Sequence, residues 1–302
     1  RSLVIARKLA ESCTNLRVYT QSNQGRSAAR NRLAQLADTE LIAWLDGDDI
    51  AAPRWLEQQF KLLCSQPNYS AVSAQGYAMT ADAYPIGPIR HPLSSAEIES
   101  RHLIGQANAF FQSTVLTKKS AIERAGCYRE QYSIGEDYDL WLRIGETGSL
   151  ANVDEYHLYY RVHDTSANAT QSTGQRTQGR DAANEARAKR GLPLLPESAD
   201  EVMPPKKDDW NRCIYWINIA FRSGNPLTAI KLLRNAIAKH PASLLLWILA
   251  VLAIADCILI RGNATPRFVA GAETRIGRLP TLSFYRVASA LNRLRRRLTH
   301  RV

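Results

Sequence analysis

The sequence predicts an α/β fold, with a mostly parallel sheet flanked by helices and a small α-helical region after it. Three observations support this prediction. Helical segments alternate with short apolar runs along residues 1–167, as in sheets whose strands are buried on both faces. The apolar run at 41–45 ends abruptly in a cluster of carboxylates. Residues 210–260 hold apolar helical segments with no strand pattern between them.

Hydrophobic periodicity predicts each element of the α/β part in turn. Helical spacing predicts helices at 2–11, 27–37, 53–63, 118–125 and 136–144. Short apolar or alternating runs predict strands at 16–20, 41–45, 69–74, 109–116 and 158–162. The stretch 80–106 is irregular and is predicted to be a loop.

The chain is predicted to have three regions. These are an α/β core at 1–167, a polar helix and linker at 168–209, and a basic helical region at 210–302. The helix of the second region is expected near 180–190, and the third region has apolar segments at 210–222, 226–239 and 243–260.

The composition is that of an ordinary globular protein. The 302 residues are 45% hydrophobic and 22% charged, which excludes wholesale disorder, a collagen-like repeat and a polytopic membrane protein. The five cysteines are widely spaced, so we expect a reducing compartment and neither a disulfide framework nor a zinc site. Segment 1–10 lacks the apolar core of a signal peptide, and the chain begins at Arg1, which favours a fragment of a longer parent.

The positive charge is concentrated in the C-terminal part. Residues 1–170 hold 17 Lys and Arg against 19 Asp and Glu, whereas residues 171–302 hold 22 against 9. Such an excess contacts the phosphates of nucleic acid or of an anionic membrane, or it forms a solvated basic surface. Nucleic acid is the less favoured partner, because no nucleic-acid-binding motif accompanies the charge.

The strongest local signal is Asp46-Gly47-Asp48-Asp49, directly after the apolar run at 41–45. Ligands of open α/β sheets bind beyond the carboxyl ends of the strands. Three carboxylates there repel one another unless a cation joins them, and Mg²⁺ or Mn²⁺ takes oxygen ligands and bridges diphosphates. The alternative is a solvated acidic turn that caps the following helix.

Two weaker signals surround it. In Gly135-Glu136-Asp137-Tyr138-Asp139-Leu140-Trp141, a carboxylate at a helix start is either a general base or a partner of the helix dipole. Asn23-Gln24-Gly25 followed by Ala29-Arg30-Asn31 places a glycine turn before a helix with an arginine. That arrangement binds a phosphate, or it is an ordinary turn with a solvated arginine.

Taken in order, these motifs resemble the family-2 glycosyltransferases with a GT-A fold. The matching residues are Asn23, Gly25, Arg30 and Asn31, then Asp46, Asp48 and Asp49, then Gly126 and Tyr128, then Glu136, Asp137, Leu140 and Trp141, and last Tyr160-Arg161-Val162-His163. The resemblance covers about residues 1–167. It implies an inverting transferase that uses a nucleotide-sugar donor and a divalent metal, Mg²⁺ or Mn²⁺.

The resemblance also implies roles for individual residues. Asp137 is the expected catalytic base, and Glu136 is the alternative base or orients Asp137. The metal is expected at Asp48 and Asp46, with Asp49 nearby. Expected donor-binding residues are Asn23, Gly25, Arg30, Asn31, Asp46, Trp141 and His163. His163 is equally well interpreted as a hydrogen-bonded residue at a strand end.

The chain departs from the family at its start. The family has a first strand, and a second strand ending in Asp-Asp-Gly-Ser, before the helix that residues 2–11 match. These elements hold the base and ribose of the nucleotide. We therefore expect the chain to begin partway through the nucleotide-binding half, which removes most clues to the nucleotide.

The C-terminal part suggests a membrane surface. Residues 244–260 have one charge, Asp256, and are interpreted as a helix buried in the appendage, an interfacial helix or a membrane span. Residues 284–298 keep helical apolar spacing among arginines, which suits a helix on an anionic bilayer or a solvated basic helix. The expected location is cytoplasmic, peripheral at the inner face of the cell membrane.

Three classes of function follow. The first is a glycosyltransferase of surface-polysaccharide or glycolipid assembly, with a glycan or glycolipid acceptor. The second is a truncated, non-catalytic transferase-like chain that binds a membrane or a partner. The third, metal-dependent nucleotidyl transfer, also uses paired aspartates but leaves Glu136-Asp137-x-x-Leu140-Trp141 unexplained.

Overall fold

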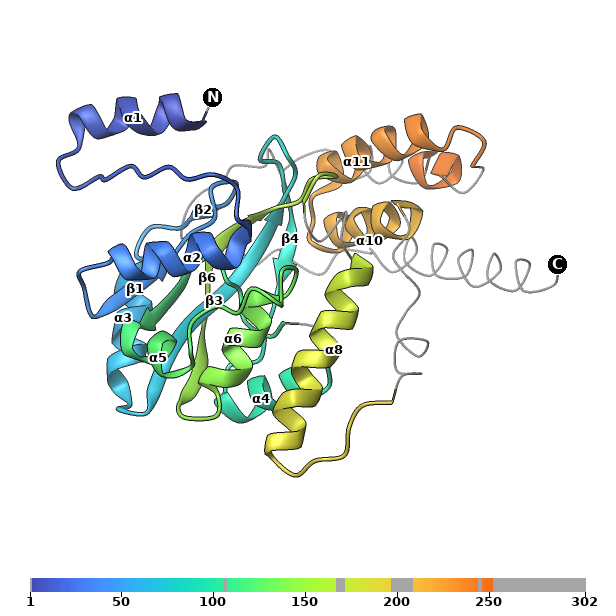
Figure 1. The fold of residues 1–302 in the computed structure, drawn as a ribbon. Helices are drawn as coiled ribbons and strands as arrows, with labels where there is room; N and C mark the ends of the chain where they lie inside the picture. The colour runs from blue at the N-terminus through green and yellow to red at the C-terminus, as the bar shows by residue number, and fades with distance from the viewer. Residues whose placement is uncertain (1, 106–107, 167–171, 197–208, 244–245, 252–302) are drawn as a thin grey trace.

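A six-stranded sheet with helices on both faces forms the centre of the protein (Figure 1). The computed structural model describes residues 2–105, 108–166, 172–196, 209–243 and 246–251. The strands are β1 (Leu41–Trp44), β2 (Ile50–Ala51), β3 (Tyr69–Met79), β4 (Pro85–Ile89), β5 (Val115–Lys118) and β6 (Ser149–Arg161). Their order in the sheet is β1-β5-β3-β6-β2, and β4 pairs with β3 beside this path.

The sheet is mixed, which corrects the prediction of a mostly parallel one. In the described part of the chain, β3 and β6 pair in parallel. The pairs β1–β5, β2–β6, β3–β4 and β3–β5 are antiparallel. The α/β class itself is confirmed. Apolar runs indicate that helices cover both faces of a sheet, but such runs contain no information on the direction of each strand.

Alternation along the strands distributes the core between the two faces. The helices beside the sheet are α2 (Gly25–Leu36), α3 (Trp55–Ser65), α4 (Ser95–Leu103), α5 (Lys119–Arg124) and α6 (Glu136–Ile144). On one face, Ala71 of β3 joins a buried cluster with residues of α2, α4, α5 and α6. On the other face, its neighbour Val72 packs in a cluster with Leu63 of α3. Successive strand residues point to opposite faces, so one strand contributes to both clusters.

The helices that follow the sheet in sequence pack either on the helices that cover it or on β4. Helix α8 (Ser172–Lys189) lies along α6, where Ala182, Ala183 and Ala186 join a cluster with Tyr138 and Leu142. Helices α10 (Asp209–Arg222) and α11 (Pro226–Lys239) pack against each other and against β4 (Figure 1). The strand contributes Ile86 to this second cluster, which also buries Leu246 and Leu249.

Much of the basic C-terminal region falls outside the described residues. This holds for 252–302, and so for most of the apolar segment 244–260 and for the expected basic helix at 284–298. Among the helices of the described ranges, none has the length and apolar character that a membrane span requires.

The sequence-based prediction missed two elements. The stretch predicted as a loop at 80–106 contains β4 and α4. Helix α4 begins with a capping box, in which the Ser94 hydroxyl accepts from the backbone N–H of Glu97 and the Glu97 carboxylate accepts from that of Ser94. The Ser-x-x-Glu pattern was therefore a usable signal.

Two predicted strands also change. Residues 16–20 form no strand, because alternation of side chains stabilises a strand only where a neighbouring strand supplies hydrogen bonds. The strand predicted at 109–116 begins only at Val115. At the N-terminus, α1 (Ser2–Ser12) forms as predicted but buries none of its residues, and it lies apart from the sheet in Figure 1.

Candidate functional site

The acidic loop after β1 is held by β6. Residues 46–49 form a turn closed by the Asp49 N–H, which donates to the Asp46 carbonyl (3.2 Å). The chain then enters β2, where Ile50 pairs with Tyr159 of β6. The loop thus turns back toward β6, and its carboxylates lie near the end of that strand.

The three carboxylates of the loop have three different partners. Asp46 Oδ1 lies 3.4 Å from Arg30 Nη2, Asp48 Oδ2 lies 3.0 Å from His163 Nε2, and Asp49 Oδ1 accepts from the backbone of Arg161 (2.8 Å). Within the described residues, no group of three or more His, Cys, Asp or Glu side chains could hold a metal ion. The expected convergence of Asp46, Asp48 and Asp49 on one cation is therefore not observed.

Asp49 anchors the loop to β6. The Asp49 carboxylate accepts from the Arg161 N–H. The Arg161 side chain adds a second contact with the loop, because its Nε donates to the Asp48 carbonyl (2.6 Å). Burial raises the pKa of Asp49 to about 6, which outweighs the opposing effect of the backbone hydrogen bond. A partly buried carboxylate that already accepts a main-chain N–H has the features of a structural anchor.

Asp48 and His163 are the most open pair of the site. The Asp48 side chain is 51% exposed and that of His163 25% exposed. The other ring nitrogen of His163, Nδ1, lies 2.9 Å from the Thr165 hydroxyl. This contact orients the ring so that Nε2 faces a carboxylate oxygen of Asp48.

Arg30 connects the helix α6 to the acidic loop. Its Nη1 donates to Glu136 Oε1, and its Nη2 contacts Asp46. The guanidinium is 12% exposed and the Glu136 carboxylate 1% exposed. Burial alone lowers the pKa of Arg30, but the carboxylates of Glu136, Asp137 and Asp46 outweigh this effect and raise it above its usual value.

Glu136 is a buried carboxylate between two arginines. Its Oε2 lies 3.1 Å from Arg26 Nη2, in addition to its contact with Arg30. Burial, and then the negative charge of Asp137, raise the pKa of Glu136 to about 7 in spite of both arginines. The side chain is inaccessible to a substrate in this arrangement.

Asp137 is half-buried at the start of α6, and each of its carboxylate oxygens has one hydrogen bond. Oδ1 accepts from the backbone N–H of Tyr138 (2.8 Å), and Oδ2 accepts from Asn108 Nδ2 (3.2 Å). Further lone pairs of both oxygens remain available. No sequence pattern indicated Asn108, which lies between the segments predicted as a loop and as a strand.

Asn31 joins α2 to the segment before α6. Its Nδ2 donates to the Tyr128 carbonyl and its Oδ1 accepts from the Tyr128 N–H, each at 2.8 Å. The Tyr128 ring packs edge-on to Trp44, with 5.7 Å between the ring centroids, and its hydroxyl accepts from Gln112. The Asn31 amide thus acts on the backbone of Tyr128, whereas a donor contact was expected.

Asn23 and Gly25 form the turn that begins α2. The Asn23 side chain accepts from the Gly25 N–H (3.1 Å), and Gly25 has a φ of +88°, a conformation that favours glycine. Beyond this turn, the Arg26 side chain donates to the Ser133 carbonyl (3.0 Å). The start of α2 therefore lies beside the segment that leads into α6.

Trp141 does not contact the site. The side chain is 0% exposed in the core cluster of the sheet, and its ring lies 5.1 Å from that of Phe110 with the planes at 62°. A donor molecule cannot reach a fully buried ring. The expected donor contact of Trp141 is thus corrected to a packing role, because this side chain lies on the face of α6 that packs against the sheet.

Sequence reasoning also missed the ion-pair network of Asp139. This buried carboxylate accepts from Arg129 and from the buried Arg143, whose guanidinium also donates to the carbonyls of Ala125 and Cys127. The network fixes the segment 125–129, which contains Tyr128. The i, i+4 spacing of Asp139 and Arg143 was the available signal.

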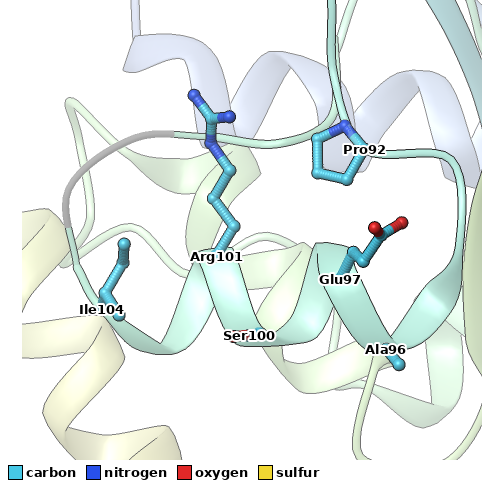
Figure 2. A pocket seen from close by; sticks show the side chains of 6 residues that line it. All are labelled: Pro92, Ala96, Glu97, Ser100, Arg101 and Ile104. Carbon is cyan, nitrogen blue, oxygen red and sulfur yellow. The ribbon is translucent and has the colours of Figure 1, made fainter.

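A separate pocket lies beside α4. Its volume is about 520 Å³, and it is lined by Pro92, Ala96, Glu97, Ser100, Arg101 and Ile104 (Figure 2). None of the predicted site residues lines it. Figure 2 shows that the lining side chains come mainly from α4, and no residue of the acidic loop is among them.

The chain is similar to known glycosyltransferases. Residues 1–124 match the family described as Glycosyl transferase family 2, a range that includes the acidic loop and ends before α6. An uncharacterized glycosyltransferase of Methanocaldococcus jannaschii is 27% identical over 48% of this chain and 50% of its own. The O-antigen biosynthesis glycosyltransferase WbnJ of Escherichia coli is 27% identical over 50% and 59%. The amylovoran biosynthesis glycosyltransferase AmsE of Erwinia amylovora is 27% identical over 48% and 53%.

A solved structure covers more of the chain at lower similarity. It is a mannosyltransferase of Pyrobaculum calidifontis in complex with GDP-Man and Mn²⁺, at 16% identity and a TM-score of 0.43 over 95% of this chain and 66% of that one. The chain spans about half the length of the curated relatives it matches. The family match and these relatives confirm the resemblance found in the motifs, which is to the family-2 glycosyltransferases.

Proposed function

We propose that this chain transfers a glycosyl group from a nucleotide-sugar donor to an acceptor hydroxyl, with inversion and with a divalent metal. The observation that carries the proposal is the link from Glu136 through Arg30 to Asp46. It places Asp137, at the start of α6, on the same side of the molecule as the loop that ends in Asp48 and Asp49.

Asp48 and His163 fit a metal site that the donor completes. A carboxylate oxygen such as that of Asp48 is the kind of ligand that Mg²⁺ or Mn²⁺ takes, and His163 Nε2 lies 3.0 Å from it as a further polar group at the same place. Such ions take few protein ligands and fill their remaining positions with water and substrate phosphates. When bound, the metal supplies positive charge for the departing diphosphate. Asp46 and Asp49, which have other partners, support the loop around this pair.

Asp137 is the base in the proposed reaction. The acceptor oxygen attacks the anomeric carbon, the bond between that carbon and the phosphate oxygen breaks, and the diphosphate leaves with the bonding electrons. The hydroxyl proton passes to a free lone pair of Asp137, whose two other contacts hold the carboxylate in place. Attack opposite to the leaving group inverts the anomeric configuration.

Glu136 has the orienting role in this proposal. It is buried at 1% exposure and bonded to Arg30, so it fixes the start of α6 and contacts no acceptor. Arg30, held between Glu136 and Asp46, presents positive charge beside the acidic loop, where a diphosphate would bind. Asn23, Gly25 and Asn31 contribute by shaping and anchoring the start of α2.

The acceptor is proposed from the relatives and the charge pattern. Relatives from Escherichia coli and Erwinia amylovora are named for O-antigen and amylovoran biosynthesis, which favours a polysaccharide or glycolipid acceptor. The basic sequence at 281–302 favours attachment to the inner face of an anionic membrane. Deletion of 281–302 should weaken sedimentation with phosphatidylglycerol vesicles, and unchanged sedimentation would remove the membrane part of the proposal.

The decisive test is binding of a nucleoside diphosphate by titration calorimetry. UDP and GDP are titrated into the protein with and without Mn²⁺. We expect binding that requires Mn²⁺ and that Asp48→Ala abolishes. The matched control is Asp38→Ala, which removes a carboxylate of an exposed ion pair with Arg17. Equal binding by wild type and Asp48→Ala would exclude the assignment of Asp48.

A further inference from the structure

Asn108 is the side chain that holds the carboxylate of Asp137 from outside α6. Its Nδ2 donates to Asp137 Oδ2 at 3.2 Å. Its Oδ1 accepts from the Phe110 N–H at 3.1 Å. Exchange of the amide nitrogen and oxygen would place oxygen against the carboxylate and the NH₂ group against another N–H, so both contacts would become repulsive. The two neighbours therefore permit only one orientation of the amide.

A buried histidine, His102, contacts the side chain of Asn108. His102 Nε2 lies 3.0 Å from Asn108 Oδ1 and 3.1 Å from the backbone nitrogen of Ala109, within hydrogen-bond distance of both. The ring is 1% exposed and packs edge-on to the ring of Tyr138, with 5.3 Å between the centroids. The Tyr138 hydroxyl in turn donates to the His102 carbonyl. These contacts connect the C-terminal end of α4 to α6.

The imidazole of His102 is uncharged in this setting. Burial lowers its pKa to about 4, and the hydrogen bond to Asn108 only partly opposes this effect. A neutral ring has one N–H and one lone pair, so Nε2 bonds either Ala109 or Asn108 at a given moment. In both tautomers of His102, the Phe110 N–H still donates to Asn108 Oδ1. The NH₂ group of Asn108 therefore faces Asp137 in either case.

We infer that Asn108 is a positioning residue for Asp137, and that His102 holds it in place. The inference rests on the proposed function, in which Asp137 accepts the proton of the acceptor hydroxyl. Asn108 donates to one oxygen and the Tyr138 N–H to the other, so the carboxylate keeps one plane.

Other charged groups also act on the Asp137 carboxylate, and a test of Asn108 must leave these groups unchanged. Glu136 precedes it on α6, and the electrostatic effects of Arg30 and Tyr128 reach it from α2 and from the segment before α6. None of these groups contacts Asn108 through a hydrogen bond in the described residues. A change at residue 108 therefore alters Asp137 directly.

The test is the titration of Asp137 followed by carboxyl ¹³C NMR, with Asp137→Asn identifying its resonance. Asn108→Asp, which faces the carboxylate with a second one, should raise the pKa of Asp137 by at least about one unit. Asn108→Ala, which only removes the donor, should raise it by less. Asn184→Asp is the matched control, since Asn184 Oδ1 accepts from Leu195 elsewhere on the molecule. An unchanged Asp137 titration in both Asn108 variants would overturn the inference.

A double variant tests the contact even if a single variant unfolds. Asn108→Asp combined with Asp137→Asn exchanges the amide and the carboxylate and keeps one donor facing one acceptor. Its urea midpoint should lie above the value expected from adding the two single effects. A midpoint at or below that sum would also count against the contact.

Activity gives the third readout and separates the two proposals. With nucleotide sugars as donors, Asn108→Ala should lower kcat about tenfold and leave the donor KM unchanged. Loss of donor affinity with an unchanged kcat would contradict the positioning role. Absence of turnover by wild type with every nucleotide sugar would count against the proposed function, while the NMR titration would still decide on Asn108.

Discussion

Arg30 on α2 bonds Glu136 on α6 across 106 residues of sequence, and the Glu136 side chain is buried while that of Arg30 is mostly covered. The same guanidinium reaches Asp46 at the end of β1. One side chain thus connects the helix that carries Asp137 with the loop that carries Asp48. The stability of the fold and the geometry of the site depend on the same ion pair.

Arg30→Ala is expected to destabilise the protein strongly, because it leaves the Glu136 carboxylate buried beside only one remaining arginine. Loss of one partner of a buried ion pair costs about 3–5 kcal/mol. Arg17→Ala is the control, since Arg17 pairs with Asp38 at the surface with 57% exposure and should cost under about 1 kcal/mol. Urea unfolding followed by circular dichroism measures both, and equal effects would contradict the importance of burial.

Glu136 should give the protein a characteristic dependence of stability on pH. Its pKa is raised in the fold to about 7, from 4.5. Between these values the folded state binds a proton that the unfolded chain has released, so this contribution to stability is present at low pH and is lost as pH rises towards 7. The slope for one proton is about 1.4 kcal/mol per pH unit.

Glu136→Gln removes this contribution. The unfolding free energies of wild type and variant are measured from pH 4.5 to 8. As pH rises, the unfolding free energy of the wild type should fall relative to that of the variant. The low pKa of His102 acts in the opposite direction in both proteins and cancels in the comparison. A difference that is constant with pH would show that Glu136 ionises normally.

Asp137→Asn tests the base separately from donor binding. Turnover of a nucleotide sugar should fall by about 10²–10⁴-fold, the usual contribution of a positioned base. Affinity for the nucleoside diphosphate should change little, because the diphosphate is expected at Asp48. Glu136→Gln should reduce turnover less. If Glu136→Gln is the inactive variant and Asp137→Asn remains active, the two roles are reversed.

Gly76→Ala should destabilise the centre of the sheet. A Cβ built on Gly76 of β3 would lie 2.7 Å from the ring of Phe111, closer than carbon atoms approach. The ring is held by neighbours, including His91 at 4.4 Å between ring centroids. We expect a loss of about 1–3 kcal/mol. Gly47→Ala is the control in thermal melting, since nothing lies within 4 Å of its Cβ position.

The sequence predicted those parts of the molecule that local patterns encode. Helix α6 begins and ends at the predicted residues, because three acidic residues at its start and apolar residues on its buried face leave little choice. The site motifs were also recognisable, since their residues recur in a fixed order. Strand direction was not predictable, because an apolar run reads the same for parallel and antiparallel neighbours.

Contacts between distant residues were the second feature beyond reach. Nothing in the sequence near Asn108 indicates that it faces Asp137, and nothing near Asp49 indicates that its partner is the Arg161 backbone. The predicted donor contact of Trp141 was wrong for a related reason. Its place in a motif was visible, but whether it faces the donor or the core depends on what covers α6.

The attachment of the acidic loop to β6 has a consequence for synthesis on the ribosome. Strand β2 pairs with β6 in the described sheet, and Asp48 meets His163 across 115 residues of sequence. At 5–20 residues per second, translation needs roughly ten seconds to progress from one to the other. During that interval the nascent chain presents the loop with neither its strand partner nor its histidine, so the acidic loop matures only after residue 163 has left the exit tunnel.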